Sequence, residues 1–148
     1  MPNRTILFVE DDEGVRRSTA EILAAHGFRM LIADSAEGAL PLLARERVDI
    51  LFADVIMPGL NGIELAKEAK RHHPGIKTML MTAYYSRAAE AGALADKLLF
   101  KPLRGAEIIA ELDALLAAYP RLTPRRRRAP RTAAPSRNHR GPSASPVP

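Results

Sequence analysis

Residues 50–62 read ILFADVIMPGLNG, and this stretch sets the pattern of the whole chain. Its first four residues are apolar without alternation, as expected of a strand that is buried on both faces of a parallel sheet. The apolar run ends at Asp54, and Pro58 and Gly59 mark a turn before a helical pattern begins at Gly62. The stretch predicts a buried strand with an acidic residue at its carboxyl end, followed by a helix.

Four similar apolar runs flank this stretch, at residues 6–9, 30–32, 79–81 and 98–100. Each run is continuous, which again favours burial on both faces, and segments of helical periodicity separate the runs. Strands that alternate with helices form a parallel sheet, because right-handed crossovers place the helices on its two faces. We therefore predict an α/β fold with a doubly wound, five-stranded parallel sheet.

The helices are expected between and after these strands. The first has an apolar face made of Val15, Ala20, Ile22 and Leu23. Gly27 should end this helix. The second helix should begin near Ser35, although Pro41 is expected to bend it or to delay its start. The remaining three are expected at about 62–71, 86–93 and 108–116.

Beyond Tyr119 the composition changes. Residues 120–148 hold seven prolines and eight arginines but no acidic residue. Such a segment has too little apolar surface to offset the entropy of ordering it. We therefore predict one folded domain over residues 1–119 and a disordered Arg/Pro-rich tail over 120–148.

The formal net charge of +5 comes from this tail. Residues 1–119 carry 14 basic and 17 acidic side chains, a net charge of −3, whereas the tail carries +8. Arginines can bind nucleic acid by releasing counterions, but no aromatic residue is interleaved with them and no helix-turn-helix pattern is present. Specific DNA binding is not expected, while weak non-specific contact between the tail and nucleic acid stays open.

The composition also bears on the compartment. The chain has no cysteine, which excludes disulfides and thiolate metal sites. Its first apolar run is four residues long and is followed by acids, unlike a signal peptide, and no window approaches the ~20 apolar residues of a membrane span. These features predict a cytoplasmic protein that makes no membrane contact.

Polar residues follow four of the predicted strands, at the edge where an open parallel sheet binds its ligands. The acidic run 10–13 follows the first strand, and Asp54, Thr82 and Lys101 follow the third, fourth and fifth. Crowded carboxylates are tolerated when they are exposed or share a cation, and few carboxylates with several waters suit Mg²⁺. A lysine and a threonine beside them suit a phosphoryl group. This edge predicts a phosphoryl site, and the lack of a Gly-rich phosphate loop argues against a bound nucleotide.

These strand ends resemble those of one known family, the receiver domain of bacterial two-component response regulators. The segment VEDDEGVR, residues 9–16, is similar to the family's acidic-pair motif, and DVIMPGLNG, residues 54–62, matches DxxMPxxxG. Thr82 with Ala83 resembles the switch threonine, and Lys101 with Pro102 resembles the family's lysine and cis proline. The resemblance covers residues 4–119 and implies a stand-alone, chemotaxis-regulator-like receiver with the flavodoxin-like strand order 2-1-3-4-5.

The resemblance also implies a role for each of these residues. Asp54 would accept a phosphoryl group from a phosphohistidine of a sensor histidine kinase or a histidine phosphotransfer protein. The metal ligands would be Glu10, Asp11, Asp54 and the carbonyl of Ile56, holding Mg²⁺. Lys101 and Thr82 would contact the phosphoryl group. Such a chain is a phosphoacceptor signalling protein rather than an enzyme, and it acts through contact with an output protein or as a phosphorelay intermediate. The alternative is a nucleic-acid-associated regulator whose basic tail responds to phosphorylation of the receiver.

Three features depart from the common pattern of the family. Ile56 and Tyr84 stand at the positions that tune attack by water, and both are bulky, which predicts slow self-dephosphorylation. Leu98 replaces the aromatic residue that usually precedes the lysine by three positions. The interval from Thr82 to Lys101 is about three residues shorter than in common receivers, so the fourth helix should be short. The last two features predict an unusual output surface.

Overall fold

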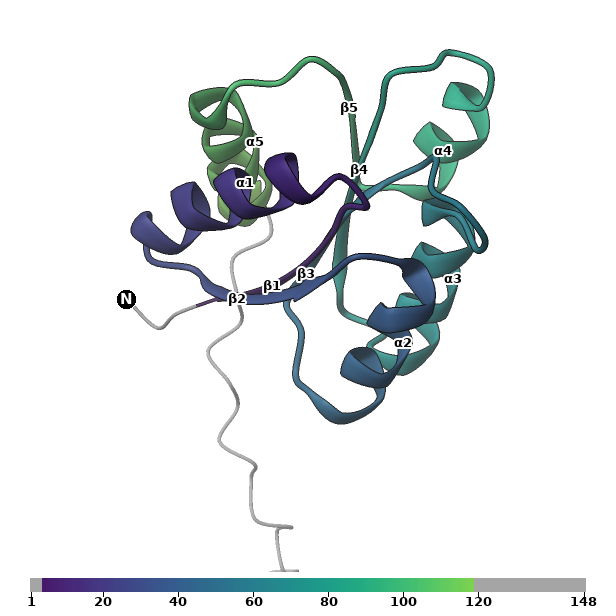
Figure 1. The fold of residues 1–148 in the computed structure, drawn as a ribbon. Helices are drawn as coiled ribbons and strands as arrows, with labels where there is room; N and C mark the ends of the chain where they lie inside the picture. Colours follow the sequence, from purple (N-terminus) through teal and green to yellow (C-terminus); the bar gives the residue numbers. More distant parts are fainter. Residues whose placement is uncertain (1–3, 119–148) are drawn as a thin grey trace, which may run out of the picture.

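Five parallel strands form one sheet in the order β2-β1-β3-β4-β5 (Figure 1). The computed structural model describes residues 4–118 of the chain. The strands are β1 (Thr5–Val9), β2 (Arg29–Ala33), β3 (Ile50–Asp54), β4 (Lys77–Thr82) and β5 (Lys97–Phe100). Every apolar run that predicted a strand lies within one of them, so the predicted α/β fold and strand order are confirmed.

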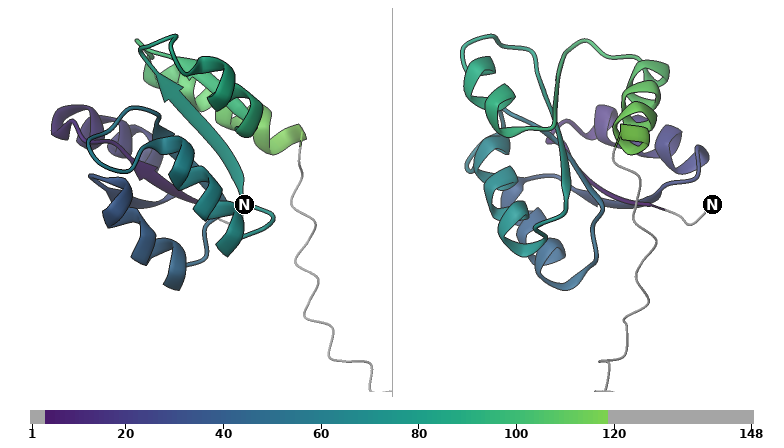
Figure 2. Two further views of the ribbon diagram at one scale, coloured as in Figure 1. Left: turned by 90° about the vertical axis from the view of Figure 1, so that its right-hand side faces the viewer. Right: turned by 180° about the vertical axis from the view of Figure 1, so that it is seen from behind.

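Five helices cover the two faces of this sheet. They are α1 (Glu13–Ala25), α2 (Ala36–Arg45), α3 (Gly62–His72), α4 (Ala88–Leu94) and α5 (Gly105–Ala118). Helices α1 and α5 pack side by side on one face, and α2, α3 and α4 lie on the other (Figure 2). No helix within residues 4–118 is both long enough and apolar enough to cross a membrane.

The strands in the middle of the sheet supply side chains to a separate core on each face. Leu7 and Val9 of β1 pack in the core beneath α2 and α3. Ile6 and Phe8 point to the opposite core, where the ring of Phe8 stacks on that of Phe52 with centroids 5.0 Å apart. A central strand therefore needs apolar residues at every position, which explains its continuous run.

The two edge strands are less buried than their sequences predict. In β2 only Ala33 is buried, and Ile32 is 46% exposed. In β5 only Leu99 is buried. The expectation of burial on both faces is therefore wrong at the edges, because an edge strand has a neighbouring strand on one side only and the helices cover it incompletely.

Helix α1 is capped by Asp12, whose carboxylate accepts a hydrogen bond of 2.9 Å from the amide of Val15. Its predicted apolar face is only partly confirmed. Ala20 and Leu23 are buried, but Val15 and Ile22 are each 40% exposed. Because these two side chains are only partly buried, they contribute less to the core than the helical pattern suggests.

Helix α2 begins where Ser35 predicts it. The Ser35 hydroxyl accepts a 3.0 Å hydrogen bond from the amide of Gly38 and so replaces one of the missing helical bonds at this end. Pro41 lies inside the helix, so of the two expected effects, a bend or a delayed start, the delayed start does not occur. Helix α4 is short, as predicted, but it starts at Ala88 without a side-chain cap.

The predicted tail, residues 120–148, lies outside the described residues. The domain boundary at residue 119 and the disorder of the tail therefore stay predictions.

Candidate functional site

Three carboxylates meet at the carboxyl edge of the sheet, as the sequence predicts. Glu10 and Asp11 follow β1, and Asp54 is the last residue of β3. One carboxylate oxygen from each lies within 4.8 Å of the other two. Glu10 and Asp54 are 1% and 6% exposed, whereas Asp11 is open to solvent. The cluster is thus buried at its base and accessible from one side.

Lys101 joins this cluster from the end of β5. Its ammonium donates to Asp54 Oδ2 at 2.5 Å and to Glu10 Oε1 at 3.1 Å. Burial alone would lower the pKa of Lys101, but its hydrogen bonds and charge contacts with Asp54 and Glu10 leave that pKa above its ordinary value. The lysine therefore stays charged and balances part of the negative charge of the site.

Burial also acts on the acids. It raises the pKa of the Glu10 carboxyl, although the amide of Asp12 and the ammonium of Lys101 both oppose the rise. The Asp12 amide donates to Glu10 Oε2 at 3.2 Å. Glu10 and Asp54 share the single ammonium of Lys101, and Asp11 adds a third carboxylate, so the cluster favours the binding of a further cation.

Backbone contacts fix the loop that carries the acidic pair. Arg16 of α1 reaches back and donates from Nη1 to the carbonyl oxygens of Glu10, at 2.9 Å, and Asp11, at 3.4 Å. The sequence analysis did not predict this contact, because its acceptors are backbone carbonyl oxygens.

The loop after β3 explains why glycine stands at two positions of the segment MPGLNG, residues 57–62. Gly59 has a φ of +79°, which favours glycine. A Cβ atom on Gly62 would collide with the backbone carbonyl of Asp54, so only glycine lets α3 start this close to β3. Asn61 caps α3 by accepting a 2.9 Å hydrogen bond from Glu64. The motif therefore sets where the Asp54 side chain stands.

Asp54 is held on both sides. The amide of Ile56 donates to Asp54 Oδ1 at 3.1 Å, and Lys101 contacts Oδ2. Ile56 itself is 39% exposed. Asp54 thus has one oxygen bound to the backbone and one bound to a cation.

Thr82 stands at the end of β4 but is not hydrogen-bonded to this cluster. Its hydroxyl accepts from the amide of Tyr84 at 3.0 Å and donates to the Tyr84 carbonyl at 3.2 Å. Its own carbonyl accepts from the amide of Lys101 at 2.9 Å, which holds the two strand ends together. The predicted residue is therefore in place, with its hydroxyl turned towards its own loop.

The Lys101–Pro102 peptide bond is cis, as the resemblance implies.

An aromatic pair lies beside Thr82. Tyr85 stacks on Phe100 with ring centroids 5.0 Å apart, and the two side chains are 78% and 40% exposed. Phe100 is the partner of Thr82 in the pairing of β4 with β5. Leu98 instead packs against the core beneath α3 and α4. The sequence showed the missing aromatic at Leu98 but not this pair, because stacking between a loop and a strand leaves no periodic pattern.

The donor set of the cluster fits Mg²⁺. Mg²⁺ prefers oxygen ligands and binds proteins through few carboxylates while it keeps several waters. The oxygens of Glu10, Asp11 and Asp54 provide such donors, and the exposed side of Asp11 leaves room for water. The acidic triad is typical of the magnesium site of receiver domains.

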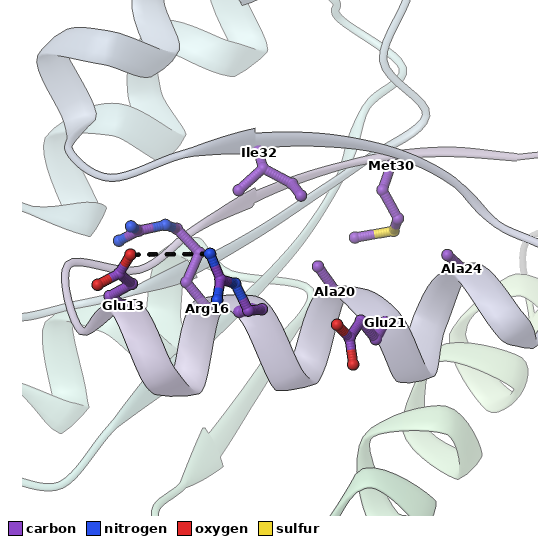
Figure 3. A pocket seen from close by; sticks show the side chains of 8 residues that line it. Glu13, Arg16, Ala20, Glu21, Ala24, Met30 and Ile32 are labelled. Carbon is purple, nitrogen blue, oxygen red and sulfur yellow. Dashed lines mark ion pairs between the residues drawn. The ribbon is translucent and has the colours of Figure 1, made fainter.

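A separate hollow of about 400 Å³ lies between α1 and β2 (Figure 3). Its apolar lining comes from Ala20, Ala24, Met30 and Ile32. Glutamates and arginines of α1 form its rim, and one such pair, Glu13 and Arg17, is 4.0 Å apart. The hollow shares no residue with the carboxylate cluster and does not extend it.

Comparisons with known proteins agree with this geometry. The chain is 41% identical to the response regulator FleR of Pseudomonas aeruginosa over 88 residues, which are 58% of this chain and 19% of FleR. It is 36% identical to the response regulator MprA of Mycobacterium leprae over 114 residues, which are 75% of this chain and 50% of MprA. The chain thus spans half or less of the length of these relatives.

Solved structures of receivers match a larger share of their own length. A CheY-like receiver domain of Methanospirillum hungatei has a TM-score of 0.73 and 28% identity, covering 78% of this chain and 95% of that chain. The response regulator TrrA of Thermotoga maritima, solved in complex with Mg²⁺ and BeF, has a TM-score of 0.70 and 28% identity, covering 76% of this chain and 99% of TrrA.

The family model of the response regulator receiver domain matches residues 6–113. This range includes the acidic pair, the aspartate that ends β3 and the lysine that follows β5. Sequence, strand order and the carboxylate cluster agree, and the chain belongs to the response regulator receiver domain family.

Proposed function

We propose that this chain is a single-domain response regulator that accepts a phosphoryl group on Asp54. The donor is a phosphohistidine of a sensor histidine kinase or a histidine phosphotransfer protein, since receiver domains are phosphorylated by histidine kinases. One observation carries the proposal: the buried Asp54 carboxylate lies among two further carboxylates and the ammonium of Lys101. The chain then acts in the cytoplasm by contact with an output protein, or it passes the phosphoryl group on.

The transfer requires an Asp54 oxygen to attack phosphorus. A bond forms between that oxygen and phosphorus, the bond from phosphorus to the histidine nitrogen breaks, and its electron pair stays on the imidazole. The product is an acyl phosphate. The Ile56 amide keeps the carboxylate oriented through Oδ1, which leaves the oxygen that now contacts Lys101 as the nucleophile.

Lys101 and Thr82 act on the transferred group. The ammonium of Lys101 moves from Asp54 to a phosphoryl oxygen, and the Thr82 hydroxyl leaves the backbone of Tyr84 for another. Mg²⁺, when bound by Glu10, Asp11, Asp54 and the Ile56 carbonyl, supplies further neutralisation of phosphoryl charge. Catalysis of this kind is positioning and charge neutralisation, so the protein is a phosphoacceptor rather than an enzyme that turns over a separate substrate.

Loss of the phosphoryl group to water is slow in this proposal. Ile56 and Tyr84 are 39% and 59% exposed, at the two positions predicted to tune access of water. Neither side chain carries a base that would activate a water molecule. The alternative function in nucleic-acid association depends on residues 120–148, which lie outside the described residues, and stays a prediction.

Asparagine in place of Asp54 tests the proposed acceptor. The Asp54→Asn variant keeps the shape of the side chain but lacks the nucleophilic carboxylate. Incubation with acetyl phosphate and Mg²⁺ is expected to add one phosphoryl group to the unsubstituted chain and none to this variant, as measured by intact-mass spectrometry. The matched control is Asp34→Asn, an exposed aspartate that follows β2, which should be labelled normally. Labelling of Asp54→Asn equal to that of the control would refute the proposal.

A further inference from the structure

Glu37, in the first turn of α2, contacts the loop between β3 and α3. Its Oε2 atom accepts a 2.9 Å hydrogen bond from the amide of Leu60. A Cβ atom placed on Gly59 would lie 2.7 Å from the same oxygen. Among residues 4–118, no lysine or arginine forms an ion pair with Glu37. The contact of its carboxylate is therefore the hydrogen bond from this loop.

The loop in question, residues 55–61, carries the backbone of Ile56. Its start is fixed by the Val55 amide, which donates to the Met81 carbonyl at 2.8 Å, and its end by the Gly62 amide, which donates to the Val55 carbonyl at 2.9 Å. Between these two anchors, Ile56 is hydrogen-bonded to Asp54 at the end of β3, and Asn61 caps α3. Within the described part of the chain, the bond to Glu37 is the one hydrogen bond that joins this stretch to an element other than the two it connects. The carboxylate therefore restrains the middle of the loop.

The acceptor of this hydrogen bond is charged at neutral pH. The hydrogen bond from the Leu60 amide holds the pKa of Glu37 below its ordinary value, so the side chain is a carboxylate. Hydrogen bonds to a charged acceptor are stronger than those between neutral groups. A negative charge also suits the first turn of a helix, where the peptide dipoles present their positive end. Glu37 is thus stabilised where it stands.

We propose that Glu37 is a positioning residue for the metal and phosphoryl site. Its carboxylate fixes the loop after β3, so that the Ile56 amide stays on Asp54 and the Ile56 backbone stays beside the carboxylate cluster. This role rests on the proposed function, because it matters to the extent that Mg²⁺ binds there. It also couples α2, which supplies no group to the cluster, to the state of that site.

Three variants test this role. Glu37→Ala removes the acceptor, and Glu37→Gln keeps an acceptor oxygen without its charge. Glu68→Ala is the control, because it removes a partly exposed helical glutamate that pairs with Arg71 on α3 at 3.0 Å. Two readouts are compared: exchange of the Ile56 and Leu60 amides with solvent in metal-free protein, and Mg²⁺ titration followed by the amide resonances of the loop.

The expected results differ among the variants. Glu37→Ala should exchange both amides faster and bind Mg²⁺ about fivefold more weakly, the change that one hydrogen bond accounts for. Glu37→Gln should recover part of this loss, and Glu68→Ala should match the unsubstituted chain. If Glu37 only stabilised the loop, Glu37→Ala would exchange the two amides faster without changing its Mg²⁺ affinity.

Two outcomes separate this inference from the proposed function. If the unsubstituted chain binds Mg²⁺ and Glu37→Ala binds it equally tightly, the role of Glu37 is wrong. If the unsubstituted chain shows no shift of the loop resonances with Mg²⁺, the proposed function fails, and the positioning role fails with it. Faster exchange in Glu37→Ala together with weaker Mg²⁺ binding supports both.

Discussion

The ammonium of Lys101 contacts carboxylates from two strands, and this arrangement was accessible from sequence. Parallel strands bring their carboxyl ends to one edge, so residues that follow separate apolar runs meet there. Asp54 and Lys101 are 47 positions apart in the chain and are hydrogen-bonded in the structure. Glu10 lies with them, nearly fully buried. Strand order alone therefore predicts the cluster, although not the distances within it.

The raised pKa of Glu10 has a consequence for stability. A carboxyl that holds its proton more tightly in the folded chain than in the unfolded chain makes the fold less stable as pH rises from its ordinary pKa of 4.5 through the raised value. Glutamine cannot ionise; its one oxygen can accept from Lys101, but its NH2 group then faces the Asp12 amide, which donates to Glu10 Oε2. In the absence of divalent cations, the unfolding temperature of Glu10→Gln relative to that of the unsubstituted chain should therefore rise as the pH rises from 4.5 towards 7.

Thermal unfolding followed by circular dichroism across this pH range measures the effect. Glu21→Gln, at an exposed position of α1, serves as the control and should leave the midpoint unchanged near pH 7. An unfolding temperature of Glu10→Gln that falls, relative to that of the unsubstituted chain, as the pH rises from 4.5 towards 7 would contradict the raised pKa of Glu10.

Other side chains of the site could not be predicted from the sequence. Glu37 and Leu60 are 23 positions apart, and the acceptor is a side chain while the donor is a backbone amide. Arg16 likewise binds carbonyl oxygens. Backbone groups carry no mark of residue type, so a contact that uses them leaves no pattern in the sequence. The orientation of the Thr82 hydroxyl was hidden for the same reason.

At the scale of the elements, the short segment between β4 and α4 links the site to the surface. The Thr82 hydroxyl makes both of its hydrogen bonds to Tyr84, and the next residue, Tyr85, stacks on Phe100 of β5. If the hydroxyl binds a phosphoryl oxygen, it must release at least one of its bonds to Tyr84. The position of the exposed Tyr85 ring is then expected to change with phosphorylation.

Tyrosine fluorescence can follow this change, because the chain contains three tyrosines and no tryptophan. Substituting Tyr84 and Tyr119 by phenylalanine leaves Tyr85 as the one tyrosine. Addition of acetyl phosphate and Mg²⁺ should change its emission. The further substitution Thr82→Ala should remove the change while labelling of Asp54 continues, whereas Thr82→Ser should retain it. An emission change of equal size with Thr82→Ala would contradict the proposed part of Thr82.

The apolar runs in the sequence predict where the strands lie better than they predict how deeply the strands are buried. Apolar runs located all five strands, because each run reflects burial in at least one core. The same pattern overstated the burial of β2, where Ile32 is 46% exposed. An apolar residue indicates that its position can be buried. Whether it is buried also depends on the place of its strand in the sheet, which the run of apolar residues does not give.

At the scale of the whole molecule, two cores on opposite faces of the sheet hold the strand ends in register. The stacked pair Phe8 and Phe52 links β1 to β3 within the core beneath α1 and α5. These strands precede Glu10 and end at Asp54, so the packing that stabilises the fold also sets the distance between the acids. The match to the receiver family over residues 6–113 covers this assembly.

The charge of the molecule is divided along the chain. The net charge of +5 combines −3 in residues 1–119 with +8 in residues 120–148. The acidic part contains the carboxylate cluster, where negative charge attracts a metal cation. The basic tail lies outside the described residues, and its disorder stays a prediction.

Chemical mapping of the phosphorylated residue tests the central claim most directly. An aspartyl phosphate is an acyl phosphate, and borohydride reduces it to an alcohol, which converts the aspartate to homoserine. After treatment with acetyl phosphate and Mg²⁺, then borohydride, tandem mass spectrometry of the digested chain should find homoserine at position 54. Homoserine at position 11, or phosphoryl transfer without homoserine at any aspartate, would contradict the assignment of Asp54 as the phosphoacceptor.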